Sequence, residues 1–355
     1  LQRGLEKIAL IIKMKILVSA LEFSANLHLK EILKYQNSKL ELFGIFDKFL
    51  SDDKPLYDLR EFSVMGFVDV LSKILKSYKA IKELALLSKD VDKVLLIDSP
   101  AFNIPLAKKI KKINPDIEII YYILPKVWAW RKNRIKKIEK YCDKLISIFP
   151  FEDKFYSNSV YLGNPLLDEI QEYKQDIKET GYIAFLAGSR KSEIKCLMPL
   201  FRELNKEINT KAILVIPKEF EDLSIYGDIA EFEISYDTKE ALLRSDFAFI
   251  CSGTATLEAA IIGTPFILTY KANNLDYFIA KQFVQLKHIG LANIIFDFYN
   301  REEFHPEFIQ RELTKENLLH NYQNTDRSKF INNSLKLREI LKKGSSRELA
   351  ELLSH

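Results

Sequence analysis

Short apolar runs alternate with helical patterns along most of this chain. The runs that predict buried strands are Lys15–Ser19, Leu42–Phe46, Lys93–Ile97, Ile117–Tyr122, Lys144–Ile148, Tyr182–Leu186, Ala212–Ile216, Phe247–Cys251 and Phe266–Thr269. Between them, apolar residues recur at a spacing near 3.6, most clearly at Ile81–Leu87 and Phe278–Leu286, which predicts helices. Alternation of strands and helices predicts the α/β class, with parallel sheets and right-handed crossovers.

The chain has 355 residues, which is too many for one ordinary core and suits two domains. Within Leu166–Thr180 the charged stretch QEYKQDIKET precedes a new strand at Tyr182. We therefore expect doubly wound domains at 14–170 and 171–331. Residues 1–13 are expected to be an N-terminal extension. Residues 332–355 have a charged amphipathic pattern, and this predicts a C-terminal helix that packs back across the junction.

Composition excludes several classes of protein. Hydrophobic residues make up 47% and charged residues 29%, as in globular proteins, and the net charge is +4. That mild charge does not argue for nucleic acid but suits a partner that carries phosphate or anionic lipid. Cys142, Cys196 and Cys251 form no CxxC pair, which indicates a reducing, cytoplasmic compartment without a metal site. No apolar run is long enough to span a bilayer, so any membrane contact is peripheral.

The stretch SGTATLEAA, which begins at Ser252, follows a buried strand and opens a helix. The N-terminus of a helix offers free N–H groups and partial positive charge, which together bind phosphate. We expect Ser252, Gly253, Thr254, Ala255 and Thr256 to line this site. Gly253 would let a phosphate approach the backbone closely, although the hydroxyls could simply cap the helix.

Two further residue sets extend this predicted nucleotide site. Gly188 and Ser189 precede Arg190, whose guanidinium can fork across two phosphate oxygens; the alternative is a surface arginine at a helix start. Glu258, one turn into the helix, can accept hydrogen bonds from ribose hydroxyls or be an ordinary surface glutamate. Neither GxxxxGK[ST] nor GxGxxG occurs, which argues against ATPases and dehydrogenases.

A series of longer motifs runs in order along the chain. They are MGFVDVL (Met65–Leu71), IDSPAFN (Ile97–Asn103), VWAWRKNRIKKI (Val127–Ile138), FPFE (Phe149–Glu152), GNPLLDE (Gly163–Glu169), GSRKSEI (Gly188–Ile194), SGTATLEAAIIGTP (Ser252–Pro265) and NII (Asn293–Ile295). In these motifs the chain resembles the lipid-A-disaccharide synthases, bacterial glycosyltransferases of the two-domain GT-B fold. The resemblance covers about 14–295 and implies two Rossmann-like domains with a cleft between them.

The resemblance also implies a reaction and its partners. A UDP-linked 2,3-diacylglucosamine donor would transfer its sugar, with inversion, to 2,3-diacylglucosamine 1-phosphate. The products would be UDP and the lipid A disaccharide of lipopolysaccharide biosynthesis. No cofactor and no metal are expected. The protein would be cytoplasmic and peripheral on the inner membrane, and a homodimer is an open alternative to a monomer.

One loop departs from the family pattern. The family reads close to G-E-x-S-G-D where this chain has Leu21-Glu22-Phe23-Ser24-Ala25-Asn26. The family's second acid after Ser-Pro is Ala101 here, and its G-H-P is Gly163-Asn164-Pro165. We therefore assign no essential chemistry to Asn26, Ala101 or Asn164. Either the loop has changed shape or the acceptor is handled differently.

The acceptor hydroxyl must lose a proton, and a carboxylate at a strand end is the natural base. Asp98 is the first candidate, with a helix N-cap as its alternative role. Glu22 is the second candidate, as a base or an acceptor-orienting group. We expect Ser24, Asn103, Trp128 and Arg131 to contact the acceptor.

The segment from Val64 to Leu84 interleaves apolar and basic residues. Phe67, Val68, Leu71 and Leu75 would form an apolar face, with Lys73, Lys76, Lys79 and Lys82 along its margin. Such a face either packs on the core or contacts a membrane and admits acyl chains. The diacyl substrates implied by the resemblance favour the membrane.

Two rival functions remain open at this point. One is a different GT-B UDP-sugar transferase or a UDP-sugar epimerase. The other is a catalytically silent nucleotide-binding protein attached to a membrane, which the altered Leu21–Asn26 loop suggests.

Overall fold

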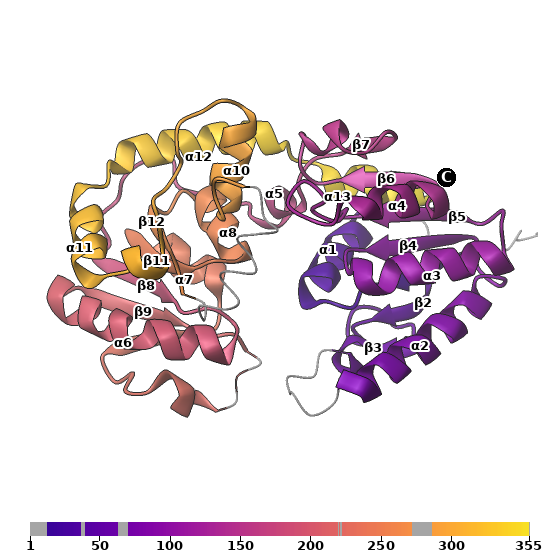
Figure 1. Ribbon diagram of the computed structural model, residues 1–355, viewed down its shortest axis with the longest axis horizontal. Coiled ribbons are helices and arrows are strands. Elements are labelled where there is room, and N and C mark those ends of the chain that lie inside the picture. The colour runs from indigo at the N-terminus through magenta and orange to yellow at the C-terminus, as the bar shows by residue number, and fades with distance from the viewer. Residues whose placement is uncertain are drawn as a thin grey trace, which may run out of the picture. The chain divides into compact units, whose positions relative to one another are not determined.

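The structure, a computed structural model, describes residues 13–36, 40–62, 70–218, 220, 222–271 and 286–354. It divides into two compact units, each built on a parallel sheet (Figure 1). Unit 1 comprises Leu1–Pro165 and Gly344–His355, and unit 2 comprises Leu166–Lys343. The division falls five residues before the boundary expected after residue 170.

Unit 1 has a sheet of seven parallel strands in the order β3-β2-β1-β4-β5-β6-β7. The strands are β1 (Met14–Ser19), β2 (Leu40–Phe46), β3 (Tyr57–Asp58), β4 (Lys93–Ile97), β5 (Glu118–Tyr122), β6 (Lys144–Ser147) and β7 (Ser159–Tyr161). The helices are α1 (Phe23–Lys34), α2 (Val70–Leu87), α3 (Pro100–Ile113), α4 (Ile135–Tyr141) and α13 (Ser345–Ser354).

Each face of this sheet has its own apolar core. Alternate side chains of β1 and β4 point to opposite faces, so Leu17 and Leu96 pack with α2 and α3, whereas Val18 and Leu95 pack with α1 and α13. Burial on both faces explains why the central strands are continuous apolar runs. The sheet thereby fixes the carboxyl ends of its strands along one edge, where loops carry polar side chains.

Unit 2 repeats this plan with a parallel sheet in the order β10-β9-β8-β11-β12-β13. Its strands are β8 (Tyr182–Leu186), β9 (Lys211–Val215), β10 (Phe232–Ser235), β11 (Phe247–Cys251), β12 (Phe266–Tyr270) and β13 (Glu307–Ile309). Its helices are α6 (Lys191–Ile208), α7 (Thr238–Arg244), α8 (Thr254–Ile262), α10 (Leu291–Phe298), α11 (Lys315–Asn324) and α12 (Arg327–Leu341), and α5 (Pro165–Glu169) lies at the division between the units.

The C-terminal region forms two helices where the sequence predicted one. The backbone turns between α12 and α13, with positive φ at Lys342 and at Gly344. α13, yellow in Figure 1, packs on α1 and places Leu349 and Leu353 in the unit 1 core. α12 belongs to unit 2, so the tail contributes one helix to each unit.

Two more expectations from the sequence concern a helix and a membrane span. The helix predicted at 278–286 lies, except for Leu286, outside the described residues. Within the described part of the chain, none of the helices combines the length and apolarity needed to cross a bilayer.

His305 lies in the core of unit 2, just before β13. Only 2% of the residue is exposed, and its ring packs on Phe266 with 4.3 Å between the ring centroids. Nδ1 lies 3.2 Å from the Pro306 carbonyl, and no described residue gives Nε2 a hydrogen-bond partner. Desolvation lowers the pKa of His305 from 6.5 to about 4, the Glu307 charge opposes this shift, and His288 adds to it.

This buried imidazole predicts an acid-sensitive unit 2. Because the folded pKa lies below the unfolded one, the unfolded chain binds an extra proton between about pH 6.5 and 4, and stability is lost as pH falls through that window. At pH 5 the loss attributable to His305 should be roughly 1–2 kcal/mol. Melting curves at pH 7.5 and 5.0 measure it.

The matched variants are His305→Gln and His320→Gln, since His320 is exposed on α11. His305→Gln should show a smaller drop in Tm between the two pH values than the wild type does. His320→Gln should keep the wild-type drop. Equal drops in all three proteins would contradict the assignment.

Candidate active site

Asp98 and Ser99 follow β4 in the left-handed region of backbone conformation, with φ of 47° and 43°. This geometry costs a non-glycine residue roughly 1–3 kcal/mol and persists only where neighbouring bonds enforce it. Here the carbonyl of Asp98 accepts hydrogen bonds from Tyr121 Oη and Asn103 Nδ2, both at 2.8 Å. The result is a sharp turn that presents the Asp98 side chain at the strand end.

Asp98 and Glu22 interact electrostatically, so the structure brings the two candidate acids together. Desolvation raises the pKa of Asp98, while the charges of Lys126 and His28 and a hydrogen bond from the Ser99 N–H oppose that rise. The pKa of Glu22 is raised by desolvation first and then by the Asp98 charge. A carboxylate with a raised pKa is a stronger proton acceptor, which suits a general base.

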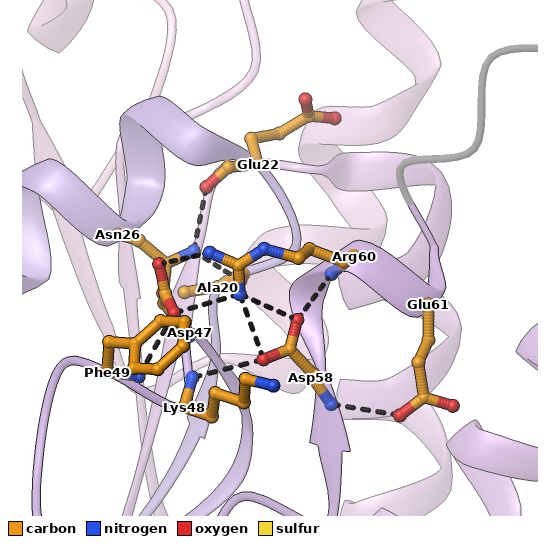
Figure 2. Close-up of polar contacts among 9 residues, drawn as sticks. All are labelled: Ala20, Glu22, Asn26, Asp47, Lys48, Phe49, Asp58, Arg60 and Glu61. Atoms are coloured by element: carbon orange, nitrogen blue, oxygen red, sulfur yellow. Dashed lines mark hydrogen bonds and ion pairs between the residues drawn. The ribbon is translucent and has the colours of Figure 1, made fainter. Parts of the chain in front are cut away.

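Glu22 is the N-cap residue of α1, but its carboxylate makes no capping bond within the part of the chain that the structure describes. Its backbone carbonyl instead accepts a 2.8 Å bond from Asn26 Nδ2. In Figure 2 the Glu22 carboxylate points away from the polar network below it. The acid is therefore positioned by its main chain and presented to solvent.

Lys126 and His28 were not identified from the sequence. Lys126 follows β5 and is exposed as a residue, yet desolvation around its ammonium lowers its pKa, and the charges of Asp98 and Glu152 oppose that shift. His28 is buried on α1. The sequence could have indicated Lys126, because it closely follows the strand predicted at Ile117–Tyr122 and so lies at a strand end.

Asn103 lies in the wrong place for the acceptor contact expected of it. Its side chain is fully buried, its Oδ1 accepts a 2.6 Å bond from Ser19 Oγ, and its Nδ2 donates to the carbonyls of Ile97 and Asp98. An amide with every polar atom used inside the core has none left to present to a ligand. Its evident role is to support the turn at Asp98.

Trp128 is also buried, and a carboxylate holds it. Its Nε1 donates to Glu152 Oε1 at 3.1 Å, and Oε2 of Glu152 accepts from the N–H groups of Ile148 and Phe149. Burial raises the pKa of Glu152 to about 7. The indole packs edge-on against Phe151, which builds a rigid wall from the FPFE motif.

Two other expected acceptor residues are exposed. Ser24 lies on α1 two residues after Glu22. Arg131 has positive φ and stacks its guanidinium over the exposed Trp130 ring, 4.2 Å from the centroid, with Arg134 at 5.7 Å. The exposed Arg131 guanidinium, with the partly buried Arg134 on the same indole, can meet an anionic group from solvent.

In unit 2, Arg190 is the N-cap residue of α6. Its side chain is 75% exposed, and Nη1 forms a 2.9 Å ion pair with Glu193, which is almost buried. Glu193 also accepts a bond from the Arg190 N–H. Gly188 has φ of 93°, and a Cβ there would lie 2.5 Å from Glu193 Oε2, so this turn requires glycine.

The N-terminus of α8 has no side-chain cap. Gly253 is its N-cap residue, and Thr256 Oγ1 donates back to the Gly253 carbonyl at 2.7 Å. Gly253 has an extended backbone, and a Cβ added to it would meet no described atom within 4 Å. N–H groups without a side-chain cap at a helix N-terminus can bind a phosphate, and the backbone of Gly253 leaves room for its approach. Ser252, Thr254, Ala255 and the partly buried Glu258 lie at this same end of the helix.

The other end of α8 is bound by segments distant in sequence. Gly263 ends the helix with φ of 86°. Arg338 of α12 donates to the Ile261 carbonyl at 3.2 Å, and the backbone N–H of Lys174 donates to that of Ile262 at 2.7 Å. The Arg338 guanidinium complements the partial negative charge at this helix C-terminus.

The architecture defines a class of protein. The chain matches the crystal structure of Acinetobacter baumannii MurG with TM-score 0.57 and 14% identity, over 96% of this chain and 99% of that one. It also matches Methanocaldococcus jannaschii UDP-GlcNAc 2-epimerase in complex with UDP-GlcNAc and UDP, with TM-score 0.60 and 13% identity, over 97% and 99% of the two chains. The fold is therefore GT-B, as predicted.

Sequence comparison gives the family. The lipid-A-disaccharide synthetase family model matches residues 16–354. The lipid-A-disaccharide synthase of Campylobacter jejuni is 52% identical over 95% of this chain and 98% of its own length. That of Helicobacter pylori strain Shi470 is 49% identical over 94% and 96%. The chain belongs to the lipid-A-disaccharide synthase family, and the resemblance read from its motifs is confirmed.

Proposed function

We propose that this chain joins UDP-2,3-diacylglucosamine to 2,3-diacylglucosamine 1-phosphate, giving lipid A disaccharide 1-phosphate and UDP. Family membership along residues 16–354 makes it a glycosyltransferase of lipid A biosynthesis. The observation that carries the specific proposal is the acid pair, Asp98 and Glu22, at adjacent strand ends of unit 1.

In the proposed mechanism Asp98 accepts the proton of the acceptor's primary hydroxyl. The hydroxyl oxygen forms a bond to the anomeric carbon of the donor from the face opposite the leaving group. The anomeric bond to UDP breaks, and UDP leaves with the electron pair, which inverts the configuration. Glu22 orients the acceptor hydroxyl, while the Lys126 charge favours the ionised form of Asp98.

The donor's diphosphate binds in unit 2 in this proposal. The uncapped N–H groups of α8 and the Arg190 guanidinium would stabilise the charge that develops on departing UDP. Glu258 would accept hydrogen bonds from the ribose. Arg190 would exchange part of its exposed ion pair with Glu193 for the phosphate oxygens, since a guanidinium has five N–H donors.

Acceptor contacts are proposed for unit 1. Ser24 and Arg131 are exposed and available, and Arg131 beside Trp130 suits the 1-phosphate. Trp128 would act through the wall that it forms with Phe151. Phe23 and Leu27 on α1 are exposed apolar side chains beside Glu22 and suit an acyl chain.

A peripheral contact with the inner membrane is proposed through α2. Phe67, Val68 and the side chain of Leu71 lie outside what the structure describes. Further along the helix, Leu75 is 64% exposed, and Ile74 and Tyr78 are comparably exposed on the same side. These side chains do not pack on the core, and Lys79 and Lys82 flank them, as in helices that bind anionic membranes.

An assay of UDP release with both lipid substrates tests the reaction. The expected result is UDP and disaccharide in equal amounts. UDP release or epimerisation with unacylated UDP-GlcNAc alone would favour the rival function, a different UDP-sugar transferase or an epimerase. An epimerase is among the solved structures that share this fold. No release with any sugar, together with retained UDP binding, would favour a silent nucleotide-binding protein.

Asp98→Asn should abolish transfer while preserving the fold. The amide has nearly the same shape but cannot accept a proton at neutral pH, so turnover should fall about 10²–10⁴-fold. Steady-state kinetics and a melting curve measure both effects. Asp92→Asn is the control, because Asp92 bonds the Lys15 N–H at the opposite edge of the sheet. Turnover within a few-fold of wild type would move the base role to Glu22.

Arg190→Ala should weaken UDP binding about 10- to 100-fold, because a charge-assisted hydrogen bond contributes about 1.5–3 kcal/mol. Titration calorimetry with UDP measures the affinity. Lys191→Ala removes a neighbouring exposed cation and should leave the affinity within about two-fold. Unchanged affinity in Arg190→Ala would remove this residue from the phosphate site.

Ile74→Ser with Leu75→Ser should weaken binding to vesicles that contain anionic lipid, and UDP affinity and Tm should stay unchanged because both side chains are exposed. Sedimentation with vesicles measures the partitioning. Ile177→Ser replaces an exposed apolar residue of unit 2 and should bind vesicles as the wild type does. Equal partitioning of all three proteins would exclude α2 as the contact.

A further inference from the structure

The loops that carry Glu22 and Asp98 are built alike. In each, an asparagine of the following helix turns its amide back toward the end of the preceding strand. Asn26 Nδ2 donates to the carbonyls of Ala20 at 2.9 Å and Glu22 at 2.8 Å. Asn103 Nδ2 donates to the carbonyls of Ile97 at 3.2 Å and Asp98 at 2.8 Å. Each amide thus bridges two carbonyls of an acid-bearing turn.

Each of the two amides also bonds the end of a strand that neighbours its own turn in the sheet. Asn26 Oδ1 accepts a 2.7 Å bond from the N–H of Asp47, directly after β2. Asn103 Oδ1 accepts from Ser19 Oγ, at the end of β1. Both asparagines are almost completely buried, so their bonds exclude water and neither amide is a substrate contact.

Asp47, whose N–H bonds Asn26, is itself held by an ion pair. The Arg60 guanidinium binds both carboxylate oxygens of Asp47, at 3.1 and 3.2 Å, and also contacts Asp58 (Figure 2). A bidentate pair of this kind fixes orientation as well as distance. Asn26 therefore connects the Glu22 turn to a well-anchored loop.

We propose that Asn26 is a positioning residue for transfer: it holds the Ala20–Glu22 turn so that the Glu22 carboxylate stays beside Asp98. This inference rests on the proposed function. Its physical basis is that the Glu22 side chain makes no capping bond within the described structure, so only the main chain fixes its position. The competing account is a purely structural bond that steadies α1 and has no effect on the acid.

A double-mutant cycle between positions 26 and 22 separates the two accounts. Asn26→Asp keeps the shape and the acceptor for the Asp47 N–H but loses both donors. In the wild-type background it should lower kcat/KM for the acceptor about 10- to 100-fold, as expected for a displacement of about 1 Å at a reacting group. In the Glu22→Gln background the same change should cost less than about three-fold, because residues that act together are not additive.

Two further measurements distinguish a displaced Glu22 carboxylate from a general loss of protein stability. UDP affinity should not change, because the proposed UDP site belongs to unit 2. In Asn26→Ala, which introduces no charge, the acidic limb of the pH–rate profile should move to lower pH, because separating Glu22 from Asp98 relieves repulsion between like charges. Asn114→Ala is the matched control: its Nδ2 bonds the Ser88 carbonyl in unit 1, before β4, and its loss should leave kinetics and pH profile unchanged.

Equal fold-losses for Asn26→Asp in the two backgrounds would overturn the inference, as would wild-type kinetics in Asn26→Asp. Asn26→Ala repeats the cycle without introducing a charge and decides the case if the aspartate variant does not fold. If the wild-type protein transfers normally and the double-mutant cycle is additive, only this inference is rejected. A wild-type protein that releases no UDP with both lipids rejects the proposed function as well.

Discussion

The left-handed backbone at Asp98 and Ser99 is the constraint on which the arrangement of unit 1 depends. Two non-glycine residues in succession with positive φ are unfavourable and need compensation from their surroundings. The compensation comes from Tyr121 on the adjacent strand and from Asn103 on the helix that follows. Asn103 in turn accepts a bond from Ser19, at the end of β1 and three residues before Glu22. The buried polar atoms at the carboxyl ends of β1 and β4 therefore bond the two turns that carry Glu22 and Asp98.

The sequence predicted the centre of each sheet but not its edges. All nine predicted strands exist, with ends within about two residues of those expected. Among the described residues, the strands that it missed are β3, β7, β10 and β13, which are the edge strands of the two sheets. Edge strands are short and only partly buried, as at Ser159–Tyr161, so their residues need no apolar run and leave no pattern to detect.

The candidate site residues that the sequence proposed are those whose chemistry is local. Asp98, Glu22 and the N-terminus of α8 were proposed because each stands at a strand end or a helix start, and the structure places Asp98 near Glu22 and leaves α8 without a side-chain cap. Asn103 was expected to contact the acceptor, but in the structure it bonds Ser19. Ser19 lies 84 residues away in the sequence, so no local pattern indicates this bond. Asn26 was set aside because its loop departs from the family pattern, and its bond to Asp47, in another loop, could not be seen in the sequence. Lys126 and Glu152 acquire their shifted pKa values only from packing.

The bonds at the C-terminus of α8 have a consequence for the connection between the units. The chain passes between units twice, beside Pro165 and beside Lys343. Lys174 follows the first passage and Arg338 precedes the second, and both donate to carbonyls at that helix end. The first and last stretches of unit 2 are thus both attached to one end of α8, opposite the end with the uncapped N–H groups.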